Sequence, residues 1–319
     1  MGYERKGFKF EILFEKYFAN FPKLFLANLI FAVPSLLIMA AFYFLSKAIF
    51  GNVNILFCLA GIVPIYPFYA GMVKVVRNTV RGDESFRVFR TYISGMKENF
   101  LPFLLHGVVI SAVAVISFLS INLYINLLSQ SWIFGALLFF CIVVVLFLFF
   151  ATMYLPLMTV TFDLPLRYIY KNSFLMSYGE FKNNFFATLA LTVMIAILLT
   201  IMLVASSAMI ILIVMAILWA LLIPVTYTFI YVFFIYDGMF SMVSGEGKKN
   251  FEKDRETADK PEKKAPAVEE ADFSAIDVTK LKDTDDYIFF NGKMVKQSAL
   301  LKMVREKEQS EKEVKQHES

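Results

Sequence analysis

Long apolar stretches dominate the first three quarters of the chain. A bilayer core about 30 Å thick requires roughly 20 apolar residues of helix, because each helical residue advances about 1.5 Å. Six stretches reach that length without an internal lysine, arginine, aspartate or glutamate: residues 24–46, 54–73, 101–127, 132–160, 185–205 and 208–236. The pattern predicts an all-α membrane protein with six transmembrane helices.

The longer connections between these stretches have a different pattern. In residues 84–100 the apolar side chains recur every three or four positions, while polar and basic side chains take the positions between them. The apolar set is Phe86, Phe89, Ile93, Met96 and Phe100, and the polar set is Arg87, Arg90, Thr91, Ser94 and Lys97. This period predicts an amphipathic helix in the membrane interface. Weaker versions of the pattern occupy residues 10–21 and 166–181.

An Asn-Phe pair stands at the point where each predicted surface helix meets a span. The pairs are Asn20-Phe21, Asn99-Phe100 and Asn184-Phe185. Asparagine is a favoured residue at helix N-termini, where backbone N–H groups lack partners. One interpretation is a threefold repeat of surface helix, bend and helical hairpin. The other is coincidence, since asparagine and phenylalanine are frequent here and a fourth pair lies in the tail.

Prolines within the predicted spans also have two interpretations. Pro64, Pro67 and Pro156 could break the second and fourth helices and free carbonyl groups for a substrate site. Proline is, however, frequent in transmembrane helices without any such role. The sequence favours the ordinary structural interpretation.

The tail has a composition of its own. Residues 244–272 are rich in Lys, Glu, Asp, Ala and Pro, which predicts a disordered linker. Within residues 273–319, Asn291-Gly292 between two apolar runs predicts a β-hairpin, and a helix is expected over 297–309. An isolated hairpin is marginal in water, so it needs a partner surface; a tail without a role is the alternative. The expected organisation is a membrane domain over 1–243 followed by this linker and tail.

Composition agrees with a membrane location. Hydrophobic residues make up 58% of the chain and charged residues 18%, which excludes an ordinary soluble domain. The net charge of +4 gives no reason to expect a nucleic-acid partner, because that function needs a concentrated basic surface. The lipid bilayer is the partner that the composition implies.

Basic residues predict the orientation of the spans. The N-terminal segment and the second and fourth connections together contain 14 Lys and Arg residues, whereas the connections on the opposite side contain only Lys47. Basic residues of short loops remain in the cytoplasm. We therefore expect a multi-pass protein of the cell membrane with both termini in the cytoplasm.

Little in the sequence indicates catalysis. None of the common nucleotide-binding, metalloprotease or serine-hydrolase motifs is present, and no charged residue lies at the middle of a span. His106 is expected to be hydrogen-bonded near the interface, with a pH-sensing role as the alternative. Cys58 and Cys141 lie in apolar runs, where cysteine behaves as a small apolar residue. The sequence thus predicts a non-enzymatic protein without a cofactor or metal.

Several short motifs resemble a known family. They are Pro67 to Arg77 with Arg81-Gly82-Asp83-Glu84, then Lys97-Glu98-Asn99-Phe100, Tyr154-Leu155-Pro156, and Lys171-Asn172-Ser173-Phe174. Over residues 10–240 the chain resembles the YesL-type family of bacterial membrane proteins of unknown function. It departs from that pattern because Tyr66, and not glycine, precedes Pro67.

The resemblance implies a multi-spanning Firmicutes protein that assists carbohydrate import by binding-protein-dependent ABC transporters. We therefore expect an accessory protein that contacts the permease subunits of an ABC importer. The candidate structural or interaction residues are Asn20, Phe21, Arg87, Phe89, Arg90, Lys97, Asn99, Phe100, Asn184 and Phe185. The alternatives are a self-contained small-molecule permease or channel and a membrane enzyme with a lipid substrate. The sequence leaves the oligomeric state open.

Overall fold

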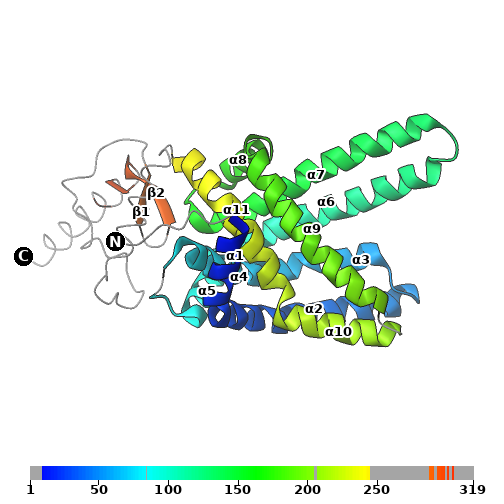
Figure 1. Cartoon of the computed structure of the whole chain (residues 1–319), viewed down its shortest axis with the longest axis horizontal. Helices are drawn as coiled ribbons and strands as arrows, with labels where there is room; N and C mark the ends of the chain where they lie inside the picture. Colours follow the sequence, from blue (N-terminus) through cyan, green and yellow to red (C-terminus); the bar gives the residue numbers. More distant parts are fainter. Residues whose placement is uncertain are drawn as a thin grey trace, which may run out of the picture. The chain divides into compact units, whose positions relative to one another are not determined.

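The protein is described by a computed structural model that covers residues 9–83, 85–204, 207–244, 287–290, 293–298, 300–301 and 304. Eleven helices and a two-stranded sheet lie in these residues (Figure 1). The chain divides into two compact units, one of residues Met1–Val160 and Pro165–Met239, the other of Thr161–Leu164 and Phe240–Ser319. The first unit contains almost all of the helical structure.

The bounds of the elements are as follows. The helices are α1 (Lys9–Ala19), α2 (Phe21–Phe50), α3 (Ile55–Leu59), α4 (Ile62–Arg81), α5 (Val88–Glu98), α6 (Phe100–Leu127), α7 (Trp132–Thr161), α8 (Leu166–Gly179), α9 (Phe181–Val204), α10 (Ala208–Leu221) and α11 (Ile223–Ser244). The strands are β1 (Tyr287–Phe290) and β2 (Lys293–Lys296).

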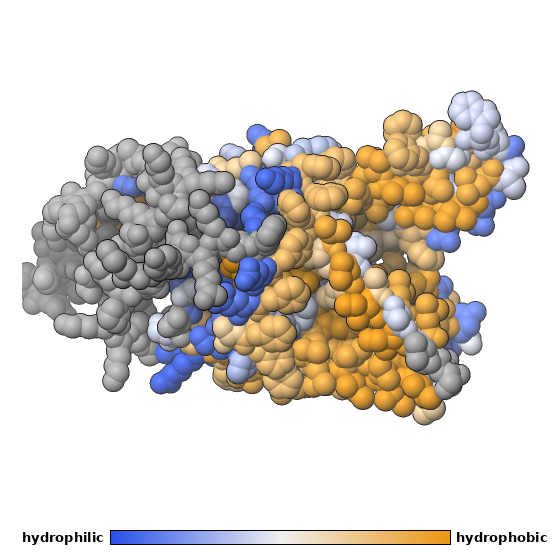
Figure 2. Space-filling view, viewed as in Figure 1, coloured by the Kyte–Doolittle hydropathy of each residue, from blue (hydrophilic) through white to orange (hydrophobic). Residues whose placement is uncertain are grey.

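Six helical segments of the described chain are long and apolar enough to cross a membrane. They are Phe21–Phe50, Ile55–Arg81, Phe100–Leu127, Trp132–Thr161, Phe181–Leu203 and Ile223–Val243. Figure 2 shows a broad apolar surface over these helices, bordered by hydrophilic residues. The predicted fold class, an all-α membrane protein with six spans, is confirmed.

Two of the predicted spans differ in detail from the structure. The second was expected to end at residue 73, but α4 continues to Arg81, so Lys74 and Arg77 belong to a helix and not to a loop. The sixth, expected over 208–236, is interrupted at Leu222 and forms α10 and α11. Pro224 explains this break, because it has no N–H to donate to Ala220 and its ring opposes a continuous helix.

The prolines of the second and fourth spans follow the ordinary structural interpretation that the sequence favours. Pro67 and Pro156 both lie inside continuous helices, and Pro64 lies in the first turn of α4. The second span is instead interrupted before Pro64, at Ala60-Gly61, between α3 and α4. The favoured interpretation is therefore confirmed for Pro67 and Pro156, and the alternative, in which they break their helices, is wrong.

A one-residue joint connects each surface helix to the span that follows it. The joints are Asn20 between α1 and α2, Asn99 between α5 and α6, and Glu180 between α8 and α9. Their φ and ψ angles are −107° and 12°, −115° and 19°, and −102° and 35°. A phenylalanine follows each joint: Phe21, Phe100 and Phe181. The chain thus repeats one arrangement three times: a surface helix, an outgoing span and a returning span.

The third repeat begins four residues earlier than the sequence pattern suggests. Asn184 and Phe185 lie inside α9, one turn beyond the joint at Glu180. Asn184 occupies the same position after its joint as Leu24 and Phe103, and all three side chains are fully buried. Ala27, His106 and Ala187, each seven residues after a joint, are also fully buried. The same helix positions therefore face the interior in every repeat.

The core of the first unit is built mainly from the returning helices. Its buried residues lie within 67–80 of α4, 150–160 of α7 and 225–239 of α11. The surface helices α1, α5 and α8 lie toward one end of this unit (Figure 1), which we call the surface-helix end. The outer parts of the spans, toward their opposite connections, bury far fewer side chains.

The second unit contains a hairpin in which β1 and β2 pair antiparallel, with Ile288 opposite Val295 and Phe289 opposite Met294. Asn291 and Gly292, the expected turn, lie outside the described residues, as do 245–272 of the expected disordered linker. Of the expected helix over 297–309, Gln297, Ser298, Leu300, Leu301 and Val304 are helical and the other residues are outside the described part.

Candidate functional site

Asn20 and Asn99 act at their joints in the same way. The side-chain Nδ2 of Asn20 donates to the carbonyl of Lys16 at 3.1 Å, and that of Asn99 donates to the carbonyl of Gly95 at 2.9 Å. Neither side chain accepts a bond from the first N–H groups of the following helix. The expected N-terminal cap is therefore wrong in its direction: these asparagines close the end of the surface helix and do not cap the start of the span.

Asn184 has a different role, because it connects three helices. Its Nδ2 donates to the carbonyls of Met176 and Ser177 in α8, both at 3.1 Å, and its Oδ1 accepts the Tyr154 hydroxyl of α7 at 2.7 Å. All hydrogen bonds of this buried side chain are made within the protein. Asn184 thus holds α8 against α7 and α9.

Helix α5 contacts the protein through a face that the sequence pattern did not indicate. Its buried residues are Tyr92 and Gly95. The Tyr92 hydroxyl donates to the carbonyl of Phe68 in α4 at 2.7 Å, and burial raises the pKa of this phenol, so it remains a donor. A Cβ at Gly71 would lie 2.5 Å from the Tyr92 carbonyl oxygen, and a Cβ at Gly95 would lie 2.9 Å from the Lys74 side chain. Two glycines thus allow α4 and α5 to approach closely.

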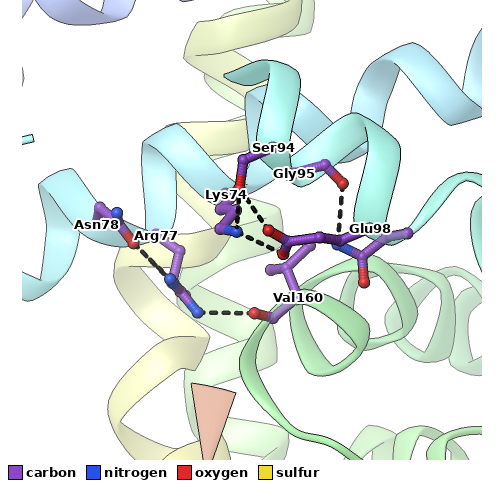
Figure 3. A network of polar contacts seen from close by, with 8 residues as sticks. Lys74, Arg77, Asn78, Ser94, Gly95, Glu98 and Val160 are labelled. Atoms are coloured by element: carbon purple, nitrogen blue, oxygen red, sulfur yellow. Dashed lines mark hydrogen bonds and ion pairs between the residues drawn. The ribbon is translucent and has the colours of Figure 1, made fainter. Parts of the chain in front are cut away.

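A buried lysine fixes the end of this helix pair (Figure 3). Lys74 of α4 donates to Glu98 at 2.6 Å and to the Ser94 hydroxyl at 2.9 Å, and Ser94 donates to the second Glu98 oxygen at 2.5 Å. Lys74 is almost fully buried, whereas Glu98 is partly exposed. A buried charge needs a partner, and Glu98 supplies it for Lys74, while the aliphatic part of Lys74 lies next to Gly95.

Arg77 lies one turn further along α4 and is 1% exposed. Its Nη1 donates to the carbonyl of Val160 at 2.7 Å, and its Nε and Nη2 donate to Asn78 Oδ1 (Figure 3). Val160 is in the last turn of α7, where the carbonyls have no partner within the helix. This turn is also the negative end of the helix dipole. Arg77 therefore caps α7 from α4, and Lys16 caps α4 likewise by donating to the Val80 carbonyl at 3.0 Å.

His106 forms a third buried polar contact. Its Nε2 lies 2.8 Å from the Thr159 hydroxyl, and its Nδ1 lies 2.8 Å from the Tyr170 hydroxyl. Thr159 donates its own proton to the Leu155 carbonyl, so it accepts from His106 Nε2. Nδ1 of a neutral imidazole then accepts from Tyr170, whose phenol pKa is raised by burial. The expected hydrogen-bonded histidine is observed, and it joins α6, α7 and α8.

Tyrosines form a further cluster between α4 and α11. The Tyr69 hydroxyl lies 2.9 Å from that of Thr228 and donates to Tyr231 at 3.1 Å. Tyr66 stacks at an angle on Tyr69, and Tyr227 packs edge-on against Tyr231. Tyr66 and Tyr227 are only half-buried. Both lie in the first two turns after a helix interruption.

These interior contacts bind helices to one another. Lys74, Arg77, Asn99, His106 and Asn184 all have partners within the protein. Among the described residues, no group of three or more histidine, cysteine, aspartate or glutamate side chains could hold a metal ion. The hydrogen bonds of these side chains join helices to one another, which is a structural role.

The remaining residues proposed from the sequence point away from the core. Phe89 is 64% exposed and Phe100 is 49% exposed, and Arg87, Arg90 and Lys97 are exposed beside them. Phe185 is 51% exposed, while Phe21 is partly covered by Tyr17 and Phe25. On α8, Tyr168, Phe174 and Leu175 are exposed close to Arg167 and Lys171. We call the exposed aromatic and basic residues of α5 and α8, with Arg87 just before α5, the surface-helix face. Its residues are Arg87, Phe89, Arg90, Lys97, Arg167, Tyr168, Lys171 and Phe174.

The fold and this site define an integral membrane protein with six spans. Residues 49–121 match the model of a family described as a protein of unknown function, DUF624, which includes the YesL-type proteins that the sequence resembles. The matched region contains the contact between α4 and α5 and the joint at Asn99. No curated protein and no solved structure matches the chain.

Proposed function

We propose that this chain is a non-enzymatic accessory protein of the cell membrane that assists an ATP-driven carbohydrate importer. The resemblance to YesL-type proteins supports the importer, and the surface-helix face supports action by docking. Aromatic residues and arginine are enriched among the interface residues that contribute most to binding energy. The partner would be the permease subunits of the importer, contacted through α5 and α8.

Seating in the membrane interface also favours exposed aromatic and basic residues, so the docking proposal needs a matched control. Phe89→Ala removes an aromatic ring from the surface-helix face, whereas Leu119→Ala removes an apolar side chain that is also exposed, but on the span α6. Affinity capture of the importer's permease subunits should fall several-fold for Phe89→Ala and stay unchanged for Leu119→Ala. Equal recovery with both variants would argue against docking through α5.

Deletion of the protein is expected to slow growth on one complex glycan while growth on the corresponding monosaccharide is unchanged. The purified protein in liposomes should not carry labelled oligosaccharide, because in this proposal the separate importer forms the path. Growth rates on the two carbon sources and flux through the liposomes are the measurements. Flux without a partner would contradict the accessory function.

A self-contained permease is the second candidate, and the tyrosine cluster favours it. Tyr66 and Tyr227 are half-buried and follow the interruptions before α4 and α11, and discontinuous helices surround the substrate in several transporter folds. Aromatic rings with hydroxyl groups suit a neutral, hydroxylated solute. If the liposome experiment detects flux, Tyr66→Phe and Tyr227→Phe should reduce it.

The orientation that we propose places the surface-helix end in the cytoplasm. Asn52 lies between α2 and α3 and Ser129 between α6 and α7, and both are exposed. Cysteines introduced at these two positions should react with an impermeant thiol reagent added to intact cells. A cysteine at Arg90, exposed on α5, should react only after the membrane is opened. The basic residues of the surface-helix end motivate this expectation. Labelling of the Arg90 position in intact cells would reverse it.

A further inference from the structure

The short connection between α7 and α8 carries an extended segment with a strand partner. Thr161, the last residue of α7, and Phe162, the first residue of the connection, are both 1% exposed. Phe162 forms a parallel bridge with Met294 of β2, and the N–H of Asp163 donates to the Met294 carbonyl at 3.1 Å. Strand β2 is thus paired along both edges, with β1 on one side and the connection on the other.

Side chains of the second unit close over this backbone contact. The Phe162 ring stacks on Phe240 with centroids 6.2 Å apart and meets Tyr287 edge-on at 6.3 Å. On the hairpin, Met294 and Val295 are buried, and Leu300 and Val304 of the helical residues after it are buried as well. The tail therefore contributes a small apolar core of its own, and Phe162 is the ring that the connection adds to it.

The contact with the connection stabilises the hairpin. Two strands alone are marginal in water, whereas a third strand and an apolar surface supply the missing burial. Addition of a strand to a free edge gives affinity through the main chain, and the side chains that alternate along it give selectivity. Pro165 has no N–H and α8 begins at Leu166, so only a few residues of the connection can pair.

We propose that residues 161–164 are a docking site for an extended strand and that the C-terminal hairpin of the same chain is its resident ligand. The ligand class is a short extended segment with an apolar side chain placed against Phe162, as Met294 is. Tethering to α11 gives the hairpin a high effective concentration, so a weak contact is sufficient. A competing strand from another protein would have to displace the hairpin. This inference does not depend on the proposed function.

A disulfide tests the register of the contact in native membranes. Cys58 and Cys141 are first replaced by alanine, and a cleavage site for a specific protease is inserted between residues 250 and 270. Phe162→Cys with Met294→Cys should oxidise readily, so that the cleaved tail stays attached until reductant is added. Phe162→Cys with Lys296→Cys is the matched control, since a shift of two residues along the strand places the Cα atoms about 8 Å apart, beyond disulfide reach.

A second pair of variants tests the contact without cysteines. Asp163→Pro removes the N–H that donates to Met294, whereas Asp163→Ala keeps it and changes only an exposed side chain. Cleavage of the tail near Lys293 by trypsin in opened membranes should be several-fold faster in the proline variant and unchanged in the alanine variant. Equal cleavage of these two variants would overturn the proposal. Equal oxidation of the two cysteine pairs, or a disulfide-linked dimer in place of an internal link, would do so as well.

Discussion

Replacement of Asn28 by leucine is expected to destabilise the protein by roughly 3 kcal/mol or more, since each buried polar group left without a partner costs about 1–3 kcal/mol. Asn28 lies in the second turn of α2 and is fully buried. Its Nδ2 donates to the carbonyls of Trp219 and Ala220, at 3.0 and 2.8 Å, and its Oδ1 accepts the N–H of Val225 at 2.9 Å. One side chain thus satisfies three backbone groups freed by the interruption between α10 and α11.

Leucine has a similar volume, so the substitution removes hydrogen bonds with little change in packing. Within a bilayer no water replaces these bonds, which makes the loss more costly than at a soluble surface. The measurement is the thermal unfolding midpoint of the purified protein in lipid nanodiscs. Asn122→Leu on α6 is the control, because Asn122 is exposed and donates only to the Phe118 carbonyl of its own helix. Equal midpoints for the two variants would show that Asn28 does not hold the interrupted helix.

Gly71→Ala should separate α5 from α4 and cost about 1–3 kcal/mol, the usual range for overpacking a buried contact. The added Cβ would lie 2.5 Å from the Tyr92 carbonyl oxygen and 2.8 Å from its ring. Because the nearest atom belongs to the backbone, α5 as a whole has to move. The Tyr92 bond to Phe68 and the Lys74 bond to Glu98 would lengthen together. Protease cleavage within α5 and the unfolding midpoint measure this effect.

Gly135→Ala supplies the comparison for that prediction. Gly135 is also within a span, but the nearest atom to an added Cβ is Leu128 Cδ2 at 3.7 Å, an ordinary contact. Alanine is the better helix former at both positions, so propensity alone would stabilise both variants slightly. A loss of stability confined to Gly71→Ala isolates the close approach of α4 and α5. If both variants are as stable as the parent, the helices can separate there at no cost.

Hydropathy was sufficient to predict the fold class because spans must be long and apolar whatever their packing. It could not locate the break at Leu222, since α10 and α11 are both apolar and Pro224 looks like the prolines that continuous helices tolerate. The Asn-Phe pairs placed the third joint at Asn184, four residues too late. The feature that the joints share is the backbone conformation of Asn20, Asn99 and Glu180, which a sequence does not show.

The interior contacts were harder to predict than the spans. The apolar period of residues 84–100 identified Phe89 of α5 and Phe100 at the start of α6. A membrane protein exposes apolar residues to lipid, so this period does not indicate which face of the helix contacts the rest of the protein. The protein-facing residues, Tyr92 and Gly95, are marked by small size and a hydroxyl. Arg77 was counted as a loop cation for the orientation, and only the structure shows that its charge caps α7. A glycine in each of two neighbouring helices was the signal in the sequence that could have found the contact.

The three joints have a mechanical consequence. Each consists of a single residue with nearly the same backbone angles, and at Asn20 and Asn99 the side chain also ties the joint to the helix before it. A connection of one residue restricts the motion of a surface helix relative to the span that follows it. Spans adjust their tilt to the thickness of the bilayer. We therefore expect a change in the tilt of α6 to change the orientation of α5. The orientation of this surface helix would then depend on the thickness of the surrounding bilayer.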